Sequence, residues 1–552
     1  MKINVKSVSL YCFLFFFILV TLSACEINIA DEGEKENDIF VKEDDVAIRP
    51  ERGGQIRLFS TKVDTFNPLL SFNSYVKEYS KLMFDSLYEI DERQIARNSL
   101  VKSDELSEDG LVWTFNLRDD VRWHNGYPFS AKDVEFTLKI LSRLDLDSIY
   151  KNNLDGIRSF SVVDDNTFKI TTESKDTNLP WKLTFPILPW SYYIDQEGFE
   201  IDNKRPPIGT GYYRVLRYDM GERLILERNE NWWKALDDED ERPFLDRIEI
   251  LFFDDHKKEL TAFQNRQVDI AFLDKEMLEQ FKNRRDVTFQ KYTSNEFEFL
   301  TFNLKSDSFV KVDAVRRAIA KGIDRTQIIN LLTRKDTSLD NLPIASESWL
   351  NDKFLPQFVA SKDRARHVLF EEGFLFGDKY FFVIDEDGEE RILEIELLVN
   401  MDNKKRVMIC EDIKTQLEDI GIRVEIIAKE RADYFNALTQ KNYELAISGI
   451  ALADYLDFES LYHSKENGLN LAGYESVKMD NLLLQFKETE SLDKKRKISE
   501  DIRKLLSEDV PYIGLFFYNK ALAYNREIFG NLEPRYWHKL NDIKSFAVER
   551  KE

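Results

Sequence analysis

The sequence predicts an α/β protein with more than one hydrophobic core. Its 552 residues exceed what one core can organise, so we expect two or three lobes. Hydrophobic residues make up 43% of the chain and charged residues 32%, a balance typical of a globular protein rather than a disordered one. Runs with the alternation of strands and runs with helical spacing follow one another along the chain.

The first folded residues show both patterns in turn. The run "GGQIRLFS" from Gly53 predicts a strand, and Asn67-Pro68 predicts a turn after it. A helix is expected next, because the following apolar residues recur at helical spacing: Val76, Tyr79, Leu82, Met83 and Leu87.

A strand, a turn and a helix are predicted again between Gly110 and Leu141. Alternation predicts the strand at Trp113, Phe115 and Leu117. Asn125-Gly126 is a strong turn signal. Ser130 with Asp133 resembles a capping box, which predicts a helix that begins there. The apolar face of that helix would consist of Val134, Leu138 and Leu141.

The formal charge of -23 restricts the partners of this chain. DNA and RNA are polyanions that proteins bind through Lys and Arg, so we expect no nucleic-acid partner. An anionic membrane surface would repel the folded part as well.

The N-terminus, in contrast, predicts a membrane-directed segment. Lys2 and Lys6 form a short basic region, and the apolar run Val8–Val20 is too short for a spanning helix but suits a secretory signal peptide. Leu22-Ser23-Ala24-Cys25 resembles the lipobox of bacterial lipoproteins, which predicts cleavage after residue 24 and lipidation of Cys25. An ordinary cleaved signal with an incidental cysteine is the alternative.

Lipidation of Cys25 would anchor the protein on the extracytoplasmic face of the cell membrane. One acyl chain binds a bilayer only marginally, whereas the two chains of a diacylglycerol bind firmly. Residues 26–52 hold ten acids and four bases with little apolar periodicity, so we expect residues 25–52 to form an acidic flexible tether. Acylation of Cys25 would leave Cys410 without a disulfide partner, and we expect Cys410 to pack in a helix.

Segments along the whole folded region carry a family resemblance. The first is "LRDDVRWHNGYPFSAKDVEFT", and the others follow in order: "IGTGYYRVLRY", "LERNENWWKA", "VRRAIAKGIDRTQII", "ARHVLFEEGF", "IKTQLEDIGIRVEI", "LAGYESVKMDNLL" and "EDVPYIGLFFY". They resemble segments of the extracellular solute-binding proteins that serve peptide ABC importers, the oligopeptide- and dipeptide-binding proteins. Tyr212 stands where that family usually has proline. The resemblance covers nearly all of residues 53–540.

The resemblance implies a two-lobed periplasmic-binding-protein fold of type II, a Venus flytrap, with an extra subdomain in the first lobe. Its lobes would close over a ligand about a hinge. The chain would cross between the lobes near Phe299–Ser306 and again near Val510–Tyr518. The expected boundaries are a signal peptide at 1–24, a tether at 25–52, lobe I at 53–89, 207–300 and 509–552, its subdomain at 90–206, and lobe II at 301–508.

The run "YELAISGIALADYLDFESLYHS" places acids at the mouth of a predicted buried strand. Asp454 and Asp457 follow the apolar run Leu445–Leu452. In the peptide-binding members, the aspartate of the segment that this run resembles holds the α-ammonium of the peptide, and by position it is Asp454. The alternative is that Asp454 only caps the turn. No tryptophan precedes it, and Leu456 and Phe458 replace the residues common in the family, which leaves the ligand pose near Phe458 open.

The resemblance implies two further parts of the ligand site. The backbones of Ile450 and Leu452 would pair with an extended peptide. The loop Phe72–Tyr75 would form the opposite wall, with Phe72 and Ser74 as the candidate contacts. Every peptide offers main-chain hydrogen bonds, and wet pockets adapt to different side chains, so such a site accepts many ligands.

No arrangement of residues predicts catalysis, a metal centre or a cofactor. The chain has no Gly-x-Ser-x-Gly elbow, no phosphate-binding loop ending in Gly-Lys-Ser/Thr and no His-Glu-x-x-His. Its five histidines are scattered without a helical i, i+4 pair, and there is no paired-cysteine zinc site. We expect Trp181, Trp190, Trp232 and Trp233 in the core or lining the cleft, with sugar stacking as the alternative.

The expected function is capture of oligopeptides outside the cell and their delivery to the permease subunits of an ABC importer, by a monomer without a cofactor. One alternative is the same fold with another solute, such as a sugar, a nickel chelate or haem. Another is a signalling lipoprotein that presents a peptide pheromone. An extracellular hydrolase is the third.

Overall fold

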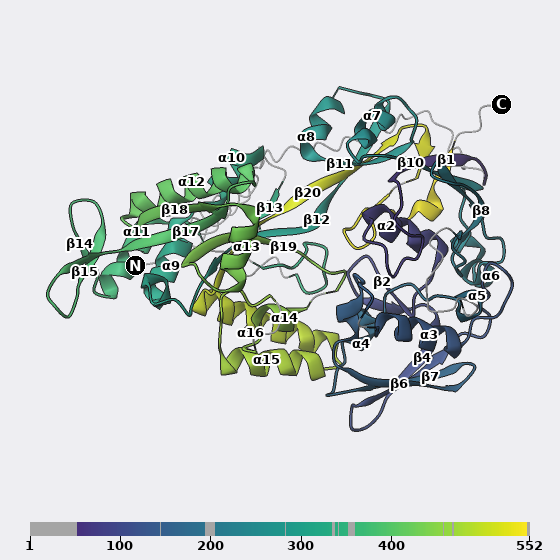
Figure 1. Cartoon of the computed structure of the whole chain (residues 1–552), viewed down its shortest axis with the longest axis horizontal. Coiled ribbons are helices and arrows are strands. Elements are labelled where there is room, and N and C mark those ends of the chain that lie inside the picture. Colours follow the sequence, from purple (N-terminus) through teal and green to yellow (C-terminus); the bar gives the residue numbers. More distant parts are fainter. Residues whose placement is uncertain are drawn as a thin grey trace, which may run out of the picture. The chain divides into compact units, whose positions relative to one another are not determined.

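The computed structural model describes residues 52–143, 145–193, 205–281, 283–333, 337–339, 342–351, 359–455, 457–465, 469–530 and 532–548. The predicted signal peptide, the predicted lipidation site at Cys25, Leu456 and all of the tether except Arg52 lie outside the described residues. The described part has the predicted mixed α/β architecture, with two lobes that share one large sheet (Figure 1).

An eleven-stranded sheet runs through the described part of the chain. Ten of its strands follow one another in the order β18 (Arg423–Lys429), β17 (Glu394–Asn400), β19 (Leu445–Ala451), β12 (Val287–Phe302), β20 (Tyr512–Asn525), β11 (Ile270–Asp274), β1 (Gln55–Thr61), β10 (Arg247–Phe253), β9 (Arg223–Arg228) and β8 (Tyr213–Asp219). The short strand β13 (Thr337–Leu339) pairs with β20 off this path. β1 is parallel to β10 and β11, β17 is parallel to β18 and β19, and the long strands β12 and β20 are antiparallel to each other.

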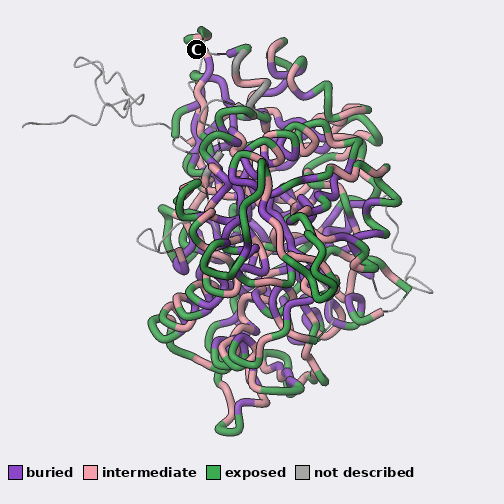
Figure 2. Tube along the Cα trace, turned by 90° about the vertical axis from the view of Figure 1, so that its left-hand side faces the viewer, coloured by how far each residue is buried: buried purple, intermediate pink, exposed green. Residues whose placement is uncertain are grey.

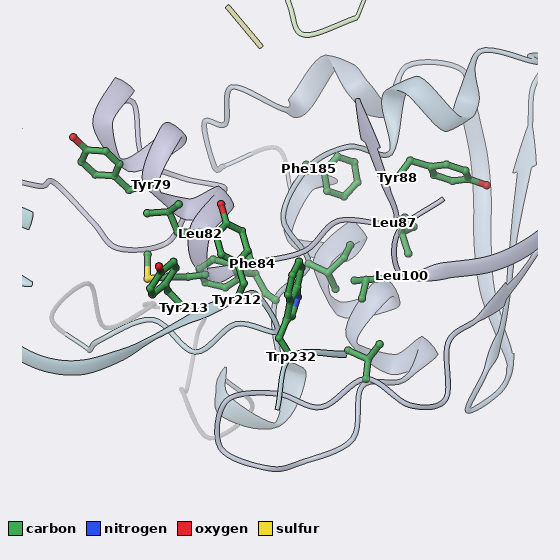
Figure 3. Packing of buried hydrophobic residues seen from close by; sticks show 14 of the residues in the cluster. Tyr79, Leu82, Phe84, Leu87, Tyr88, Leu100, Phe185, Tyr212, Tyr213 and Trp232 are labelled. Atoms are coloured by element: carbon green, nitrogen blue, oxygen red, sulfur yellow. The ribbon is translucent and has the colours of Figure 1, made fainter. Parts of the chain in front are cut away.

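Lobe I is built on β11, β1, β10, β9 and β8. Helix α2 (Ser74–Met83) packs its apolar face into the core of this lobe, and Figure 3 shows the cluster around it, which includes Tyr79, Leu82, Phe84, Tyr212, Tyr213 and Trp232. The helix ends at Met83, so Leu87 reaches the same core from the segment that follows. A Cβ atom at Gly209 would lie 1.8 Å from the carbonyl oxygen of Met83, so only glycine fits beside the end of α2. The other elements of lobe I are α6 (Trp233–Asp237), α7 (Lys258–Gln264), α8 (Lys275–Leu278), β21 (Ile528–Phe529) and β22 (Ala547–Val548).

The subdomain is an antiparallel four-stranded sheet with one long helix. Its strands follow the order β4 (Val101–Leu106), β5 (Val112–Leu117), β7 (Thr167–Thr172) and β6 (Ile157–Asp164). Helix α3 (Ala131–Leu141) begins with the predicted capping box of Ser130 and Asp133. Its apolar face joins the core of lobe I. The shorter elements here are β2 (Tyr88–Ile90), β3 (Ala96–Asn98), α4 (Leu179–Lys182) and α5 (Trp190–Tyr193).

Lobe II surrounds β17, β18 and β19 with helices and has a core of its own. Cys410 is fully buried on α12 (Lys404–Ile420), which confirms its predicted packing role, and burial raises the pKa of its thiol far above the usual value. The remaining helices of the lobe are α9 (Asp313–Gly322), α10 (Arg325–Thr333), α11 (Lys362–Glu371), α13 (Arg431–Thr439), α14 (Phe458–Tyr462), α15 (Val477–Glu488) and α16 (Leu492–Asp509). A separate three-stranded sheet is formed by β14 (Leu375–Phe376), β15 (Phe381–Ile384) and β16 (Glu390–Ile392).

The two lobes are joined through β12 and β20. Ile513 and Phe516 at the start of β20 belong to the core of lobe II, whereas Leu522 farther along belongs to the core of lobe I. The pairing of β12 with β20 shifts register between Thr293 and Phe297, between these two regions. A register irregularity of this kind lets a paired strand bend and twist locally.

Burial follows these cores. In Figure 2 the buried stretches lie inside the described part of the chain, and many of the exposed stretches form its outer turns. None of the helices in the described ranges combines the length and the apolar character that crossing a bilayer requires.

Candidate functional site

Asp454 lies where lobe II meets lobe I. It follows the end of β19 by three residues, as predicted from the sequence, and its side chain faces α2 of lobe I. The Lys77 ammonium on α2 donates a hydrogen bond to Asp454 Oδ1 at 3.0 Å. This ion pair joins two residues that are 377 positions apart in the chain and belong to different lobes.

The start of α2 sets the direction of Lys77. Asn73 caps the helix by accepting a hydrogen bond from the Tyr75 N–H at 2.9 Å. Lys77 and Lys81 are one turn apart, so they share a face of the helix beside its buried apolar stripe. Lys81 donates to the backbone oxygen of Trp537, which ties this face to the C-terminal return of lobe I.

Electrostatics favour the charged forms of both partners. Burial works against ionisation of the Asp454 carboxyl, but the positive charges of Lys77, Lys81 and Lys539 outweigh burial and lower the pKa of that carboxyl. Burial likewise opposes the charge of Lys77, but Asp454 outweighs it and raises the pKa of the Lys77 ammonium. The side chains of Lys77 and Asp454 keep 32% and 19% of their exposure, so water reaches the pair from one side.

Gln94 reaches the backbone of Asp454 from the turn between β2 and β3. Its Nε2 donates to the Asp454 carbonyl oxygen at 3.2 Å and to the Tyr536 hydroxyl at 2.6 Å. A carbonyl oxygen only accepts hydrogen bonds, so this contact settles which end of the Gln94 amide is nitrogen. The other end, Oε1, is buried and has no hydrogen-bond partner among the described residues, so it can accept from a ligand or a water.

Aromatic side chains from both lobes meet beside Gln94. The rings of Trp181 in the subdomain and Trp349 in lobe II stack with centroids 6.4 Å apart, and the Trp181 indole donates to the Gln94 carbonyl oxygen at 3.0 Å. A cavity of about 20 Å³ lies here, which is room for about one water molecule. It is lined by Gln94, Asn178, Trp181, Trp349, Leu350, Tyr455 and Phe486.

The second acid of the run has a different role. The Asp457 side chain accepts a hydrogen bond from the Ser460 N–H at 3.1 Å and caps α14. Asp457 therefore caps a helix, whereas the Asp454 carboxylate binds Lys77.

The other predicted ligand-site residues lie on both sides of the Lys77–Asp454 ion pair. Ile450 is part of β19 and pairs with Phe297 of β12. Leu452 follows β19, and its N–H donates to the Asn295 carbonyl oxygen at 2.8 Å, so that N–H is engaged within the chain. Ser74 is the first residue of α2, Phe72 lies two residues before it, and both are exposed, Phe72 at 65%.

Sequence reasoning missed Lys77, Gln94 and Tyr536. A lysine on the flank of an amphipathic helix has the pattern of an ordinary solvated residue, so nothing marked Lys77. Gln94 adopts a left-handed backbone conformation with φ of 66°, which a glycine or asparagine would have signalled and a glutamine does not. In the described ranges, no group of three or more His, Cys, Asp or Glu residues is arranged to hold a metal ion.

Comparisons with known proteins identify this architecture. Residues 96–469 match the family model described as bacterial extracellular solute-binding proteins, family 5 Middle. The oligopeptide-binding protein AppA of Bacillus subtilis (strain 168) is 25% identical over 545 residues, which is 95% of this chain and 95% of that protein. The structure of AppA from Bacillus subtilis in complex with a nonapeptide matches with a TM-score of 0.65 at 22% identity, covering 91% of this chain and 100% of that chain.

Other similar proteins have different names. Heme-binding protein A of Haemophilus influenzae is 22% identical over 445 residues, which is 75% of this chain and 78% of that protein. The structure of HbpA2 from Haemophilus parasuis matches with a TM-score of 0.77 at 18% identity, covering 90% of this chain and 100% of that chain. These structural matches confirm the predicted two-lobed fold.

Proposed function

The chain belongs to the bacterial extracellular solute-binding proteins of family 5, and we propose that it captures oligopeptides between its lobes and delivers them to the permease subunits of an ABC importer. The observation that carries this proposal is the Asp454 carboxylate at the lobe boundary, ionised and already bound to an ammonium group. An α-ammonium of a peptide is the same chemical group as the one on Lys77. The similar protein AppA is named as an oligopeptide-binding protein, which points to the same class of ligand.

The partly unpaired edge of strand β19 supports the proposal of an extended peptide ligand. Its edge toward β12 is fully paired, but its other edge pairs with β17 only at Leu445 and Ala446. Beyond Ala446, no described strand pairs with that second edge. Residues Gly449–Ala451 are half-buried or exposed there, so their backbone can pair with a peptide strand, with Ile450 among them.

Two measurements test the peptide assignment. Mass spectrometry of small molecules released by denaturing the purified protein should find peptides; a haem, a metal chelate or a sugar in their place would overturn it. Calorimetry with a nonapeptide library should show that Asp454→Ala weakens binding of free-amino peptides at least about thirtyfold, equivalent to about 2 kcal/mol for a lost partner of a desolvated charge. N-acetylated peptides should lose little.

Asp457→Ala is the matched control for Asp454→Ala. It removes the neighbouring carboxylate, which caps α14 rather than facing lobe I, and should leave the preference for free-amino peptides unchanged. Equal losses for free-amino and acetylated peptides in Asp454→Ala would show that Asp454 does not hold the ammonium.

Anchoring is the second part of the proposal. We propose that Cys25 carries the lipid that holds this protein at the extracytoplasmic face of the membrane, that it acts as a monomer and that it catalyses no reaction. Cys25→Ala should move the protein from the membrane fraction to the medium while leaving peptide binding in solution unchanged. A membrane-bound Cys25→Ala protein would overturn the anchor.

A further inference from the structure

The Lys77–Asp454 contact is an ammonium–carboxylate pair at the place proposed for the ligand's own ammonium. Only Lys77 makes an ion pair with the Asp454 carboxylate among the described residues. The geometry is a single hydrogen bond of 3.0 Å, not the two-point contact of a guanidinium, and the pair stays partly open to water. A contact of this kind is readily exchanged.

The surroundings make addition of a second ammonium unfavourable. The charges of Lys77, Lys81 and Lys539 all reach Asp454. Glu78, the nearby buried acid, is occupied by the Leu540 N–H at 3.0 Å and lies 4.0 Å from Lys81. A ligand ammonium placed beside Asp454 while Lys77 stays bound would add a positive charge to a partly desolvated cluster of three lysines, so replacement of Lys77 is favoured over addition of a second ammonium.

The Lys77 ammonium can move away from Asp454 because its flexible side chain extends from α2 of lobe I. Its side chain comes from α2, and four methylene groups connect its ammonium to the helix, so rotation about them moves the charge toward water without moving α2. Asp454 instead is held at its backbone by Gln94. The mobile partner of the pair is therefore Lys77, and the fixed partner is Asp454.

We propose that Lys77 is a specificity-determining residue of the proposed peptide site: it is an internal competitor that the ammonium of an incoming ligand replaces on Asp454. This inference rests on the proposed function. Ligands with a free amino terminus displace Lys77 and bind the Asp454 carboxylate in its place, whereas acetylated ligands leave the Lys77–Asp454 ion pair intact. Lys77 thus lowers the affinity for free-amino peptides and sets how strongly they are preferred.

The chain offers a matched control for this competition. Lys175 in the subdomain forms an ion pair with Glu490 at 2.8 Å, also across the two lobes but away from Asp454. Lys175→Met therefore removes one inter-lobe ion pair with the same substitution and leaves the Asp454 carboxylate occupied by Lys77. Peptide binding by Lys175→Met therefore measures the effect of losing one inter-lobe ion pair alone.

Calorimetry should compare the parent, Lys77→Met and Lys175→Met, with a free-amino nonapeptide library and the same library N-acetylated. Lys77→Met should bind the free-amino library about three- to fivefold more tightly than the parent, the effect of removing a partly exposed ion pair. Acetylated peptides should change less than about twofold, and Lys175→Met should change both libraries equally. In the Asp454→Asn background, Lys77→Met should produce no gain.

Two results would overturn the inference. Weaker binding of both libraries in Lys77→Met would show that Lys77 contacts the ligand directly, and a gain equal to that of Lys175→Met would show a general effect of lobe contact. A second measurement needs no ligand: thermal unfolding of Lys77→Met, Asp454→Asn and the double variant should be non-additive if the pair forms in solution. Additive changes would overturn the pair itself.

The same data separate this inference from the proposed function. If no variant binds either library, the proposed peptide function fails and the exchange fails with it, while non-additive unfolding would leave Lys77–Asp454 as a structural contact. If the parent binds peptides and Lys77→Met shows no selective gain, only the competition is overturned.

Discussion

Two ion pairs of this protein join the same kinds of charge but differ in burial and in the number of hydrogen bonds. Glu298 of β12 and Arg406 of α12 form a buried pair, with side chains only 7% and 13% exposed and two hydrogen bonds of 2.9 and 3.0 Å between them. Lys77 and Asp454 lie between the lobes, are more exposed, and share one hydrogen bond. The first pair is part of a core, whereas the second is the pair for which we propose an exchange of partner. Burial and the number of hydrogen bonds, not charge, distinguish the two pairs.

The largest expected effect is on the buried pair. Arg406→Leu should lower the free energy of unfolding by about 4 kcal/mol, because it leaves the Glu298 carboxylate buried without its cation. Chemical denaturation measures this change. The double variant Glu298→Leu/Arg406→Leu should recover part of the loss, since no unpaired charge remains. A loss below about 1 kcal/mol for Arg406→Leu would show that water reaches Glu298 and that the contrast with Asp454 is wrong.

A third buried charge, the Lys495 ammonium at the lobe boundary, predicts that the stability of the fold depends on pH. Among the described residues, Lys495 of α16 hydrogen-bonds only to neutral oxygens, those of Asn178 and Phe486, and burial lowers the pKa of its ammonium to about 7. The folded chain therefore binds fewer protons than the unfolded one above that pH, so stability should rise by about 3 kcal/mol between pH 7 and roughly 9.5. Below pH 7 both states are protonated, and the burial penalty is present in full.

Lys495→Met tests that dependence. The variant should lose the rise in stability above pH 7 when denaturation is followed at several pH values, because it has no proton to release. Lys139→Met on the exposed face of α3 is the control and should keep the rise. A parent protein whose stability is flat from pH 7 to roughly 9.5 would contradict the prediction.

Gln94 tests how rigidly Asp454 is held. Gln94→Ala should lower the free energy of unfolding by about 2 kcal/mol, because it removes the hydrogen bonds to Tyr536 and to the Asp454 carbonyl oxygen. Gln94→Gly should lose about 1 kcal/mol less than Gln94→Ala, since glycine accepts the positive φ of this position without strain. Equal losses in the two variants would show that the backbone there relaxes.

The smallest expected effect is the pH dependence of the exchangeable pair. The pKa of the Asp454 carboxyl is lower in the folded chain than the ordinary pKa of an aspartate, so its ionisation stabilises the fold above that ordinary pKa, and this contribution is lost as pH falls through the folded pKa. Asp454→Asn should therefore be about 1 kcal/mol less stable than the parent at neutral pH, and the difference should shrink as acid protonates Asp454 in the folded parent. Acid denaturation curves of the two proteins measure this; a difference that does not change with pH would have a cause other than ionisation.

Local structure and the α/β architecture could be predicted from the amino-acid pattern alone. The alternation of "GGQIRLFS" predicted β1, the capping box of Ser130 and Asp133 predicted the start of α3, and the apolar run before Asp454 predicted β19. These features depend on residues a few positions apart, whose periodicity reports the backbone and its buried face. The ordered family segments predicted the two-lobed fold, which the family match supports.

The partner of Asp454, in contrast, follows from long-range packing of the folded chain. Lys77 is 377 positions away and Gln94 is 360, and neither residue differs in pattern from an ordinary polar residue. Contacts at that separation depend on how two independent cores meet, because β12 and β20 carry the chain from one lobe to the other and bring α2 against the end of β19. The carboxylate could be predicted from the chain, but the ammonium that occupies it came from packing.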